Sequence, residues 1–317
     1  MKTQALCMML AVLLAAAGCA APQAVPAGAG EPVTIARLYR PGHTWRYRLL
    51  TTYIENGEKK RVTESLTAHQ AVAGDPPGEV VQLERVIRDL GDVQQVIGGP
   101  RAELPAWWLS LAPGGRVALP PLAGLRPGMV GAIADLQTFL VAVSPKVGAD
   151  RVHRVGDVHV LPRPTTGDWG GAAGVPVGLD CIQPRVELIA VGARTVRLRT
   201  TFAPPAEPCA VLAGRPAWLR APVQPEAGPN NFIQVLAVDG RYVFMWGRER
   251  FTIEAEVRRS DGLLLAGRMD NRLQLRMRVM CDRDGTNCQA EAVPMRIRRR
   301  LRLELLPTDG PDRTQRD

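Results

Sequence analysis

Downstream of Val186 the chain alternates apolar and polar residues in short runs, and this alternation limits the possible folds more than any other feature. The sequences between the runs are rich in glycine and charge: GAR, DGR, GRER and RSDG. Alternation with a period of two places apolar side chains on one face of a strand and polar side chains on the other. The pattern predicts strands at VELIAVG, TVRLRTTF, FIQVLAV, YVFMW, FTIEAEV, LQLRMRVM and MRIRRRLRLEL.

The first half of the chain follows the same pattern. WRYRLLTTYI, from Trp45 to Ile54, alternates as a strand, and Asn56-Gly57 in the following ENGEKK is a strong hairpin signal. RVTESLTAHQAV then reads as the returning strand, and GEVVQLERVI continues the meander. Short strands at near-regular spacing indicate an antiparallel sheet that curls towards a barrel.

Helical periodicity occurs in one long segment, from Gly128 to Val143. Its apolar residues recur at the spacing of a single helix face, and Pro145 ends the segment: Met129, Ile133, Leu136, Leu140 and Val143. LPAWWLSL, from Leu104 to Leu111, is interpreted as a short helical turn. The predicted fold class is mainly β: a strongly curved antiparallel sheet or incomplete barrel with one amphipathic helix.

The first residues have the features of an export signal. Lys2 supplies one basic charge, and Ala5 to Ala17 form an uncharged apolar run. A membrane-spanning helix needs about 20 residues, so this run suits the shorter apolar region of a signal peptide. The run leads into LLAAAGC, which resembles the lipobox of bacterial lipoproteins. The resemblance implies that residues 1–18 are removed and that Cys19 is acylated; ordinary secretory cleavage at the same alanines is the alternative.

The lipobox also sets the expected organisation of the rest. Residues 19–35 are rich in alanine, proline and glycine with almost no charge, which predicts an extended tether. A single β-rich domain is expected over 36–306, with two subdomains (36–165 and 166–306) as an alternative, and a disordered tail over 307–317. An alanine rather than an aspartate follows Cys19. In the Gram-negative lipoproteins that this chain resembles, that residue implies a lipid anchor on the periplasmic face of the outer membrane.

Four cysteines follow Cys19, and an even number in an exported chain indicates disulfides. Four cysteines allow three connectivities, and their order in the sequence favours Cys181 with Cys209 and Cys281 with Cys288. CDRDGTNC, from Cys281 to Cys288, has the oxygen-bearing side chains of a calcium loop. It lacks the 12-residue length and closing glutamate of an EF-hand, so a disulfide-closed hairpin is the preferred interpretation.

The chain is basic, with a formal net charge of +9, and its basic residues are mostly arginine. An envelope location argues against nucleic acid, so anionic lipid, lipopolysaccharide or another envelope protein are the expected partners. The basic residues concentrate on the last predicted hairpin, where a one-residue bulge near Val293-Pro294 would place them on one face. The candidate anion-binding residues are Arg276, Arg278, Arg296, Arg298, Arg300 and Arg302. A solvated face that binds nothing in particular is the alternative.

Other candidate sites are weaker. His153, Asp157 and His159 have no spacing typical of a metal site, and neither a metal nor another cofactor is expected. Trp107 and Trp108 either line an apolar pocket or cap a core, and GDWGG, from Gly167 to Gly171, lacks the lysine and helix of a phosphate loop. No catalytic residue is assigned, because none of the serines downstream of Cys19 lies in a nucleophile elbow: Ser65, Ser110, Ser144 and Ser260.

The lipobox, tether and curved sheet together resemble the half-barrel lipoprotein carriers of the LolA/LolB/LppX type. PGHTWRYRLL, with Gly42, Trp45 and Tyr47, is also similar to the opening of uncharacterised envelope lipoproteins. The resemblance implies a non-catalytic envelope protein that binds a hydrophobic or lipid ligand within the curved sheet. A structural or interaction module that docks through the arginine face is the alternative. A large apolar cavity would favour the first function, and a filled core the second.

Overall fold

The computed structural model describes residues 32–91, 93–98, 103–111, 117–118, 125–142, 153–160, 175–177, 184–202, 232–238, 240–283 and 285–307. This part of the chain forms fourteen strands and one helix. In chain order they are β1 (Thr44–Glu55), β2 (Glu58–Val72), β3 (Gly78–Asp89), β4 (Gln94–Val96), β5 (Ala106–Ser110), β6 (Val117–Ala118), α1 (Pro127–Ala142), β7 (Val158–Val160), β8 (Val175–Val177), β9 (Arg185–Val191), β10 (Thr195–Phe202), β11 (Phe232–Val238), β12 (Arg241–Arg258), β13 (Leu264–Cys281) and β14 (Ala290–Leu305).

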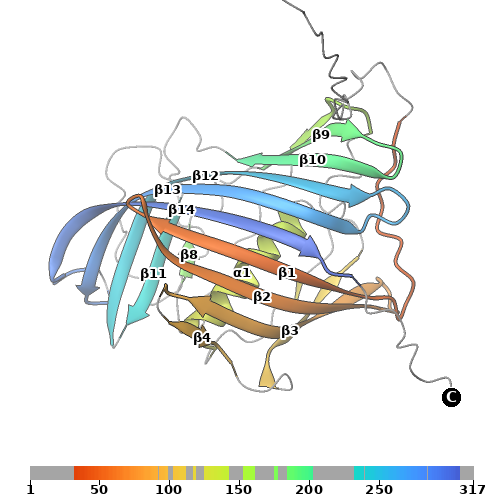
Figure 1. Cartoon of the computed structure of the whole chain (residues 1–317). Coiled ribbons are helices and arrows are strands. Elements are labelled where there is room, and N and C mark those ends of the chain that lie inside the picture. The colour runs from red at the N-terminus through yellow and green to blue at the C-terminus, as the bar shows by residue number, and fades with distance from the viewer. Residues whose placement is uncertain are drawn as a thin grey trace, which may run out of the picture.

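All the strands belong to one antiparallel sheet, as the alternation of the sequence predicts. The main path runs β6-β5-β3-β2-β1-β14-β13-β12-β10-β9-β7, and β4, β8 and β11 pair beside it. Strand β14 pairs with β1, so strands from both halves of the chain share the sheet. Among the described residues β6 and β7 do not pair with each other, and the sheet is strongly curved but open (Figure 1). The predicted fold class is confirmed.

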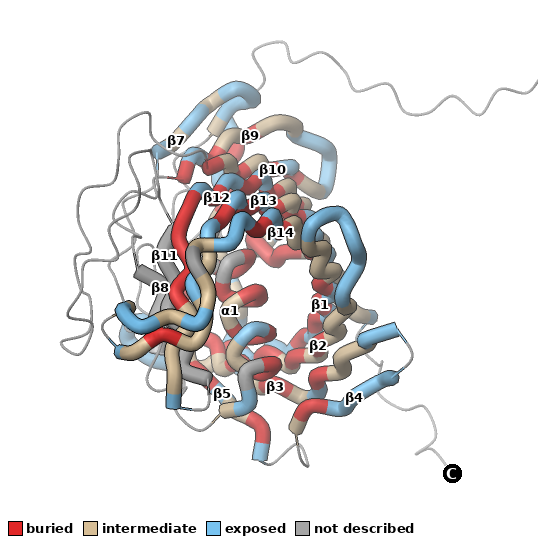
Figure 2. Tube along the Cα trace, turned by 90° about the vertical axis from the view of Figure 1, so that its left-hand side faces the viewer, coloured by how far each residue is buried: buried red, intermediate tan, exposed pale blue. Residues whose placement is uncertain are grey.

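The core lies inside the curve of the sheet, around α1. Figure 2 shows α1 enclosed between β12–β14 and β1–β3, with buried positions facing it. Ile133, Leu136 and Phe139 of α1 are at most 1% exposed. Phe139 lies so close to β13 that a Cβ atom on Gly267 would come within 2.7 Å of its ring. The predicted helix is therefore confirmed, with its apolar face packed on the sheet; Val143 lies outside the described residues. Among the described residues, no helix is long and apolar enough to cross a membrane.

Two segments differ from their sequence-based interpretation. Leu104 to Leu111 contains strand β5 rather than a helical turn, because it pairs with β3 at Trp107 and Val81. The predicted strands YVFMW and FTIEAEV are one continuous strand, β12, and the GRER between them is not a turn. In both places, pairing with a neighbouring strand overrides the local sequence signal.

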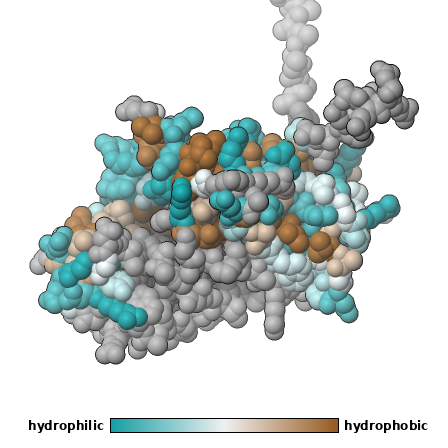
Figure 3. Space-filling view, turned by 90° about the horizontal axis from the view of Figure 1, so that it is seen from below, coloured by the Kyte–Doolittle hydropathy of each residue, from teal (hydrophilic) through white to brown (hydrophobic). Residues whose placement is uncertain are grey.

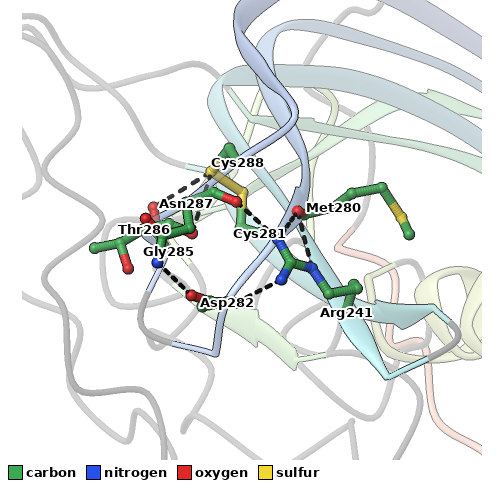
Figure 4. Close-up of a disulfide and its surroundings, with 8 residues drawn as sticks. All are labelled: Arg241, Met280, Cys281, Asp282, Gly285, Thr286, Asn287 and Cys288. Carbon is green, nitrogen blue, oxygen red and sulfur yellow. Dashed lines mark hydrogen bonds and ion pairs between the residues drawn. A yellow bond between two sulfur atoms is a disulfide. The ribbon is translucent and has the colours of Figure 1, made fainter.

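The disulfide predicted between Cys281 and Cys288 is present and closes the loop between β13 and β14. Arg241 of β12 holds this loop: its guanidinium donates to the backbone oxygens of Met280 and Asn287 and to Asp282 (Figure 4). Closing a loop of this length by a disulfide lowers the entropy of the unfolded chain, which stabilises the folded state by about 2.5 kcal/mol. Because the Asp282 carboxylate is paired with Arg241, the loop has the arrangement expected of a disulfide-closed hairpin. Cys181 and Cys209 lie outside the described residues, and their pairing stays a prediction.

The folded part of the chain begins earlier than the predicted boundary at residue 36. Residues 32–39, the N-terminal strap, run along one end of the strands (Figure 1). Val33 and Ile35 are 4% and 0% exposed. The backbone nitrogen of Leu38 donates to the oxygen of Asp261 at 3.1 Å. The last residues assigned to the tether therefore belong to the core, because their alternate apolar side chains cover the open end of the sheet.

Candidate functional site

A basic groove of about 1170 Å³ lies on the outer face of the sheet, where β12, β13 and β14 bend. Alternation places most arginines of these strands outward, while Leu273 and Leu301 point to the core. Residues of the β1–β2 turn line the groove beside β14 (Figure 1). Six arginines line it: Arg248 and Arg250 of β12, Arg272 of β13, and Arg296, Arg298 and Arg300 of β14.

The register of the sheet brings these arginines side by side. Arg250 lies opposite Arg272, and Arg272 lies opposite Arg298, so three guanidinium-bearing residues stand in one row across three strands. The next row contains Arg248 and Arg296, separated by Gln274. Like charges directly opposite each other in a sheet are destabilising. The row of arginines therefore lowers the stability of the isolated protein, and stabilisation of the fold does not explain its presence.

One carboxylate, that of Asp270, sits among these arginines. Arg298 donates to it from Nε and Nη2 at 2.9 and 2.6 Å, and Arg272 donates more loosely at 3.5 and 3.2 Å. Arg298 lowers the pKa of Asp270 to about 2, with a further contribution from Arg272. Within the described residues, Arg248, Arg250, Arg296 and Arg300 have no carboxylate within ion-pair distance. The groove therefore carries a positive charge that the described part of the chain does not neutralise.

β12 bends near the groove (Figure 1), and Gly247 allows β12 to lie close against β13 beside it. A Cβ atom at this position would lie 2.0 Å from the backbone oxygen of Gln274 on β13. On the other side, Asn56 fixes the β1–β2 turn against β14. Its backbone nitrogen donates to the oxygen of Arg296, and the nitrogen of Arg296 donates to its side-chain oxygen at 3.0 Å. Backbone contacts therefore position both sides of the groove, with one additional hydrogen bond to the Asn56 side chain.

The six predicted arginines are divided by the structure. Arg296, Arg298 and Arg300 line the groove, whereas Arg276, Arg278 and Arg302 do not. Arg302 pairs with Glu304, and the guanidinium of Arg278 lies 5.5 Å from the centre of the Trp246 ring. The predicted bulge is present, because the register between β13 and β14 shifts next to Val293. That shift places arginine opposite arginine.

Sequence reasoning missed Arg248, Arg250 and Arg272 as members of the site. Arg248 and Arg250 belong to GRER, which was interpreted as a turn. The signal that could have found them is the alternation of Arg248, Arg250 and Thr252 with the buried Glu249, Phe251 and Ile253, which continues without a break through this segment.

A polar belt lies on the inner face behind the groove, around Arg299. Arg299 donates to Asp135 of α1 at 2.9 Å and to Asn271 at 2.8 Å, and Asn271 donates to Glu249 at 2.7 Å. Thr51 donates to the other oxygen of Asp135. Burial raises the pKa of Asp135, and Arg299 opposes that shift. Because each charge in this belt has a partner, we interpret the belt as the connection between α1 and the sheet beneath the groove.

A second buried charged cluster lies beneath the N-terminal strap. Nη1 of Arg37 is 3.5 Å from Glu79, and Nδ1 of His69 is 3.3 Å from the other oxygen of Glu79. The side chains of all three residues are at most 3% exposed. Thr67 lies 3.0 Å from Nε2 of His69. This cluster joins the strap to β2 and β3, and it lies apart from the residues that line the groove.

The remaining candidates have structural roles. Asp157 accepts hydrogen bonds from the backbone nitrogens of Arg154 and His153, which lower its pKa. His153 contacts the backbone oxygen of Val33 through Nδ1. In the part of the chain that is described, no group of three His, Cys, Asp or Glu side chains could hold a metal ion. Trp107 is 3% exposed and belongs to the core. Cys19 and Gly167 to Gly171 lie outside the described residues.

On the side of β3 and β4, the described surface mixes apolar and polar residues. Seen from the side of β3 and β4, hydrophobic residues form small patches between hydrophilic ones (Figure 3). The large exposed apolar side chains on this side include Leu90, Val93 and Val96, which are 50%, 59% and 61% exposed.

Comparison with known proteins identifies no family. No family model matches the sequence, and no curated protein matches it. Among solved structures, the chain is similar to one described as "Lipid-protein interactions in lipovitellin", with a TM-score of 0.46 and 11% identity. The similarity covers 88% of this chain and 27% of the lipovitellin chain. A likeness of this degree carries no argument about function.

Proposed function

We propose that this protein is a non-catalytic, lipid-anchored cell-envelope protein that binds anionic groups through the arginine groove. The row of Arg250, Arg272 and Arg298 on three neighbouring strands carries this proposal. Arginine keeps its proton at any physiological pH, so these side chains cannot relieve their repulsion by deprotonation. An anion that neutralises them recovers the free energy that the row costs, and guanidinium groups bind phosphate oxygens in a bidentate manner.

Anionic head groups of the envelope are the counter-charges that fit the proposed location. A basic residue near an anionic membrane surface contributes about 1 kcal/mol of attraction. The location itself rests on LLAAAGC and on Cys19, which would anchor the chain by its acyl groups. Replacing Cys19 with serine is expected to release the protein from the membrane fraction or to leave the signal peptide uncleaved. Unchanged cleavage and membrane fractionation would contradict the anchor.

The binding proposal is tested with a full-length chain that carries Cys19→Ser, so that no acyl group contributes. The chain is expected to bind phosphatidylglycerol vesicles better than phosphatidylcholine vesicles, and to lose the preference as salt rises. Replacing Arg250, Arg296 and Arg300 with glutamine should remove the preference, because none of the three has a carboxylate partner in the described residues. Equal binding to both vesicle types at low salt would contradict binding of anionic membrane head groups by the groove.

A second candidate function, binding of a hydrophobic ligand inside the curved sheet, is favoured by one observation. Beyond the polar belt, the inner face carries a separate apolar cluster: Met245, Leu273, Leu275, Met295 and Ile297, with the half-buried Met277 and Tyr53 beside it. Methionine side chains adapt to ligands of irregular shape. However, α1 and its neighbours fill the sheet at the main core, where Ile133, Leu136 and Phe139 are at most 1% exposed. Mass spectrometry of lipids that co-purify with the native protein tests this second candidate.

A further inference from the structure

The arrangement of charge in the groove is not that of a uniformly basic face. Arg296 and Arg300 point outward from β14 and line the groove. Arg268 and Arg302 also point outward but do not line it. These two residues lie opposite each other in the register of β13 and β14, one row beyond Asp270. A flat membrane surface would attract both sets similarly, because long-range attraction depends on charge rather than on concavity. A ligand that sits in the groove would contact the first set alone.

The spacing of the arginines indicates how many anionic groups such a ligand needs. Neighbouring strands lie about 4.8 Å apart, so β12 and β14 are separated by about 10 Å at the level of the backbone. Arg248 and Arg250 project from β12 at one side, and Arg296 and Arg300 project from β14 at the other. A single orthophosphate cannot neutralise both sides. A ligand with two or more linked phosphate groups can.

Between these two sides, Arg272 and Arg298 are held by Asp270. Arg298 uses Nε and Nη2 for the Asp270 carboxylate, which leaves its Nη1 hydrogens for another acceptor. The six arginines less the Asp270 carboxylate leave the groove with a net charge of +5. Glu249 also lines the groove, but its carboxylate bonds to Asn271 and lies 3.6 Å from Arg299 on the inner face.

We infer that the groove binds one discrete ligand carrying at least two linked phosphate groups, which bridge the arginines of β12 and β14, with Asp270 as a positioning residue for Arg272 and Arg298. This inference rests on the proposed function and narrows it from an anionic surface to a polyphosphorylated ligand. Such a group can belong to a lipid head group or to a free condensed phosphate. The chemistry recognised is the same in both.

The test is titration calorimetry of the full-length Cys19→Ser chain with sodium tripolyphosphate and with sodium orthophosphate at equal ionic strength. Tripolyphosphate is expected to bind with a stoichiometry of one, and at least about tenfold more tightly than orthophosphate, because it contacts both sides of the groove. The double variant Arg250→Gln, Arg296→Gln is expected to weaken tripolyphosphate binding at least about tenfold. The matched control is Arg268→Gln, Arg302→Gln, which removes the same charge outside the groove and should change the affinity by less than about twofold.

Asp270→Asn separates positioning from net charge. The variant adds one positive charge to the groove, so simple electrostatic attraction predicts tighter binding of tripolyphosphate. Loss of the carboxylate that orients Arg272 and Arg298 predicts weaker binding of tripolyphosphate together with stronger binding to phosphatidylglycerol vesicles. Tighter tripolyphosphate binding by Asp270→Asn would overturn the positioning role.

The outcomes distinguish this inference from the function on which it rests. Binding to phosphatidylglycerol vesicles without binding to tripolyphosphate would overturn the discrete ligand and leave the anionic-surface function standing. Equal losses of tripolyphosphate affinity in the groove variant and in the control variant would also overturn the discrete ligand. Binding to neither probe would overturn both proposals. Tripolyphosphate binding without vesicle binding would support a free condensed phosphate as the ligand, whereas binding to both probes, with the same variant dependence, would support a head group.

Discussion

At the scale of single residues, Asp270 is the carboxylate that pairs with two arginines of the groove, Arg272 and Arg298. Its side chain is 34% exposed and accepts hydrogen bonds from two arginines on two strands. Arg298 is the main cause of its lowered pKa, and Arg272 adds to the effect. The carboxylate therefore offsets part of the repulsion between these two arginines, which would otherwise face each other unscreened.

This environment predicts that Asp270 stabilises the fold in a defined pH range. The pKa of about 2 in the folded state is below the ordinary value of 3.8, so the stabilisation is present above about pH 4 and is lost as the pH falls through 2. Allowing for solvent screening of this partly exposed side chain, Asp270→Asn should lower the free energy of unfolding by about 1 kcal/mol at neutral pH. Urea unfolding of both proteins between pH 7 and pH 2 measures the difference, which should shrink towards zero at the acid end. A difference that stays constant down to pH 2 would contradict the ion-pair explanation.

The part of the groove contributed by β14 could be predicted from the sequence, but the part contributed by β12 could not. Arg296, Arg298 and Arg300 alternate with apolar residues, so a strand pattern alone places them on one face. The role of Asp270 could not be predicted, because its partner Arg298 is 28 residues away in the sequence. Cross-strand register depends on bulges and on pairings between distant segments, and these are not encoded in any local pattern.

At the scale of elements, β12 shows how a local signal is overridden. Glycine with neighbouring charges is typical of a turn, and GRER has that composition. In the structure β12 pairs with β13 from Tyr242 to Val257, and the pairing continues through Gly247 without a turn. Glycine is required there because the backbone of β13 approaches too closely for a side chain. For this segment the sequence therefore predicts strand correctly but divides one continuous strand, β12, in two.

Substitution of Gly247 tests this close approach of the two strands. A Cβ atom would meet the backbone oxygen of Gln274 at 2.0 Å, so Gly247→Ala must displace β12 from β13. We expect a loss of at least about 2 kcal/mol of unfolding free energy. Binding of anionic vesicles should also weaken, because displacing β12 moves Arg248 and Arg250, which line the groove.

The matched control is Gly131→Ala in α1, where a Cβ atom would meet nothing within 4 Å. Alanine favours a helix, so this control should raise the unfolding free energy by about 0.5 to 1 kcal/mol. Thermal and urea unfolding of the two variants provides the measurement. Similar small effects in both variants would mean that β12 tolerates a side chain at Gly247.

At the scale of the whole molecule, the N-terminal strap connects the beginning of the chain to distant parts of the sheet. The backbone nitrogen of Val33 donates to the oxygen of His153 at 2.8 Å, and the hydroxyl of Tyr39 donates to the oxygen of Gly262 at 3.2 Å. A Cβ atom on Gly262 would lie 2.4 Å from the backbone oxygen of Ala36, so the strap is in close contact with the turn between β12 and β13. Its composition resembles the preceding tether, which is why the sequence places the boundary too late.

Ile35 provides the sharpest test of the strap, because it is fully buried while Leu38, three residues later, is 67% exposed. Ile35→Ala removes buried methyl and methylene groups from the main core and should lower the unfolding free energy by about 2 to 4 kcal/mol. Leu38→Ala removes similar apolar atoms from the surface and should change it by less than about 0.5 kcal/mol. Urea unfolding of the two variants measures both effects. If Ile35→Ala cost no more than Leu38→Ala, the strap would not be part of the folded core. A large difference would show that the strap is an integral part of the folded core, because the burial of Ile35 would then contribute to the stability of the whole sheet.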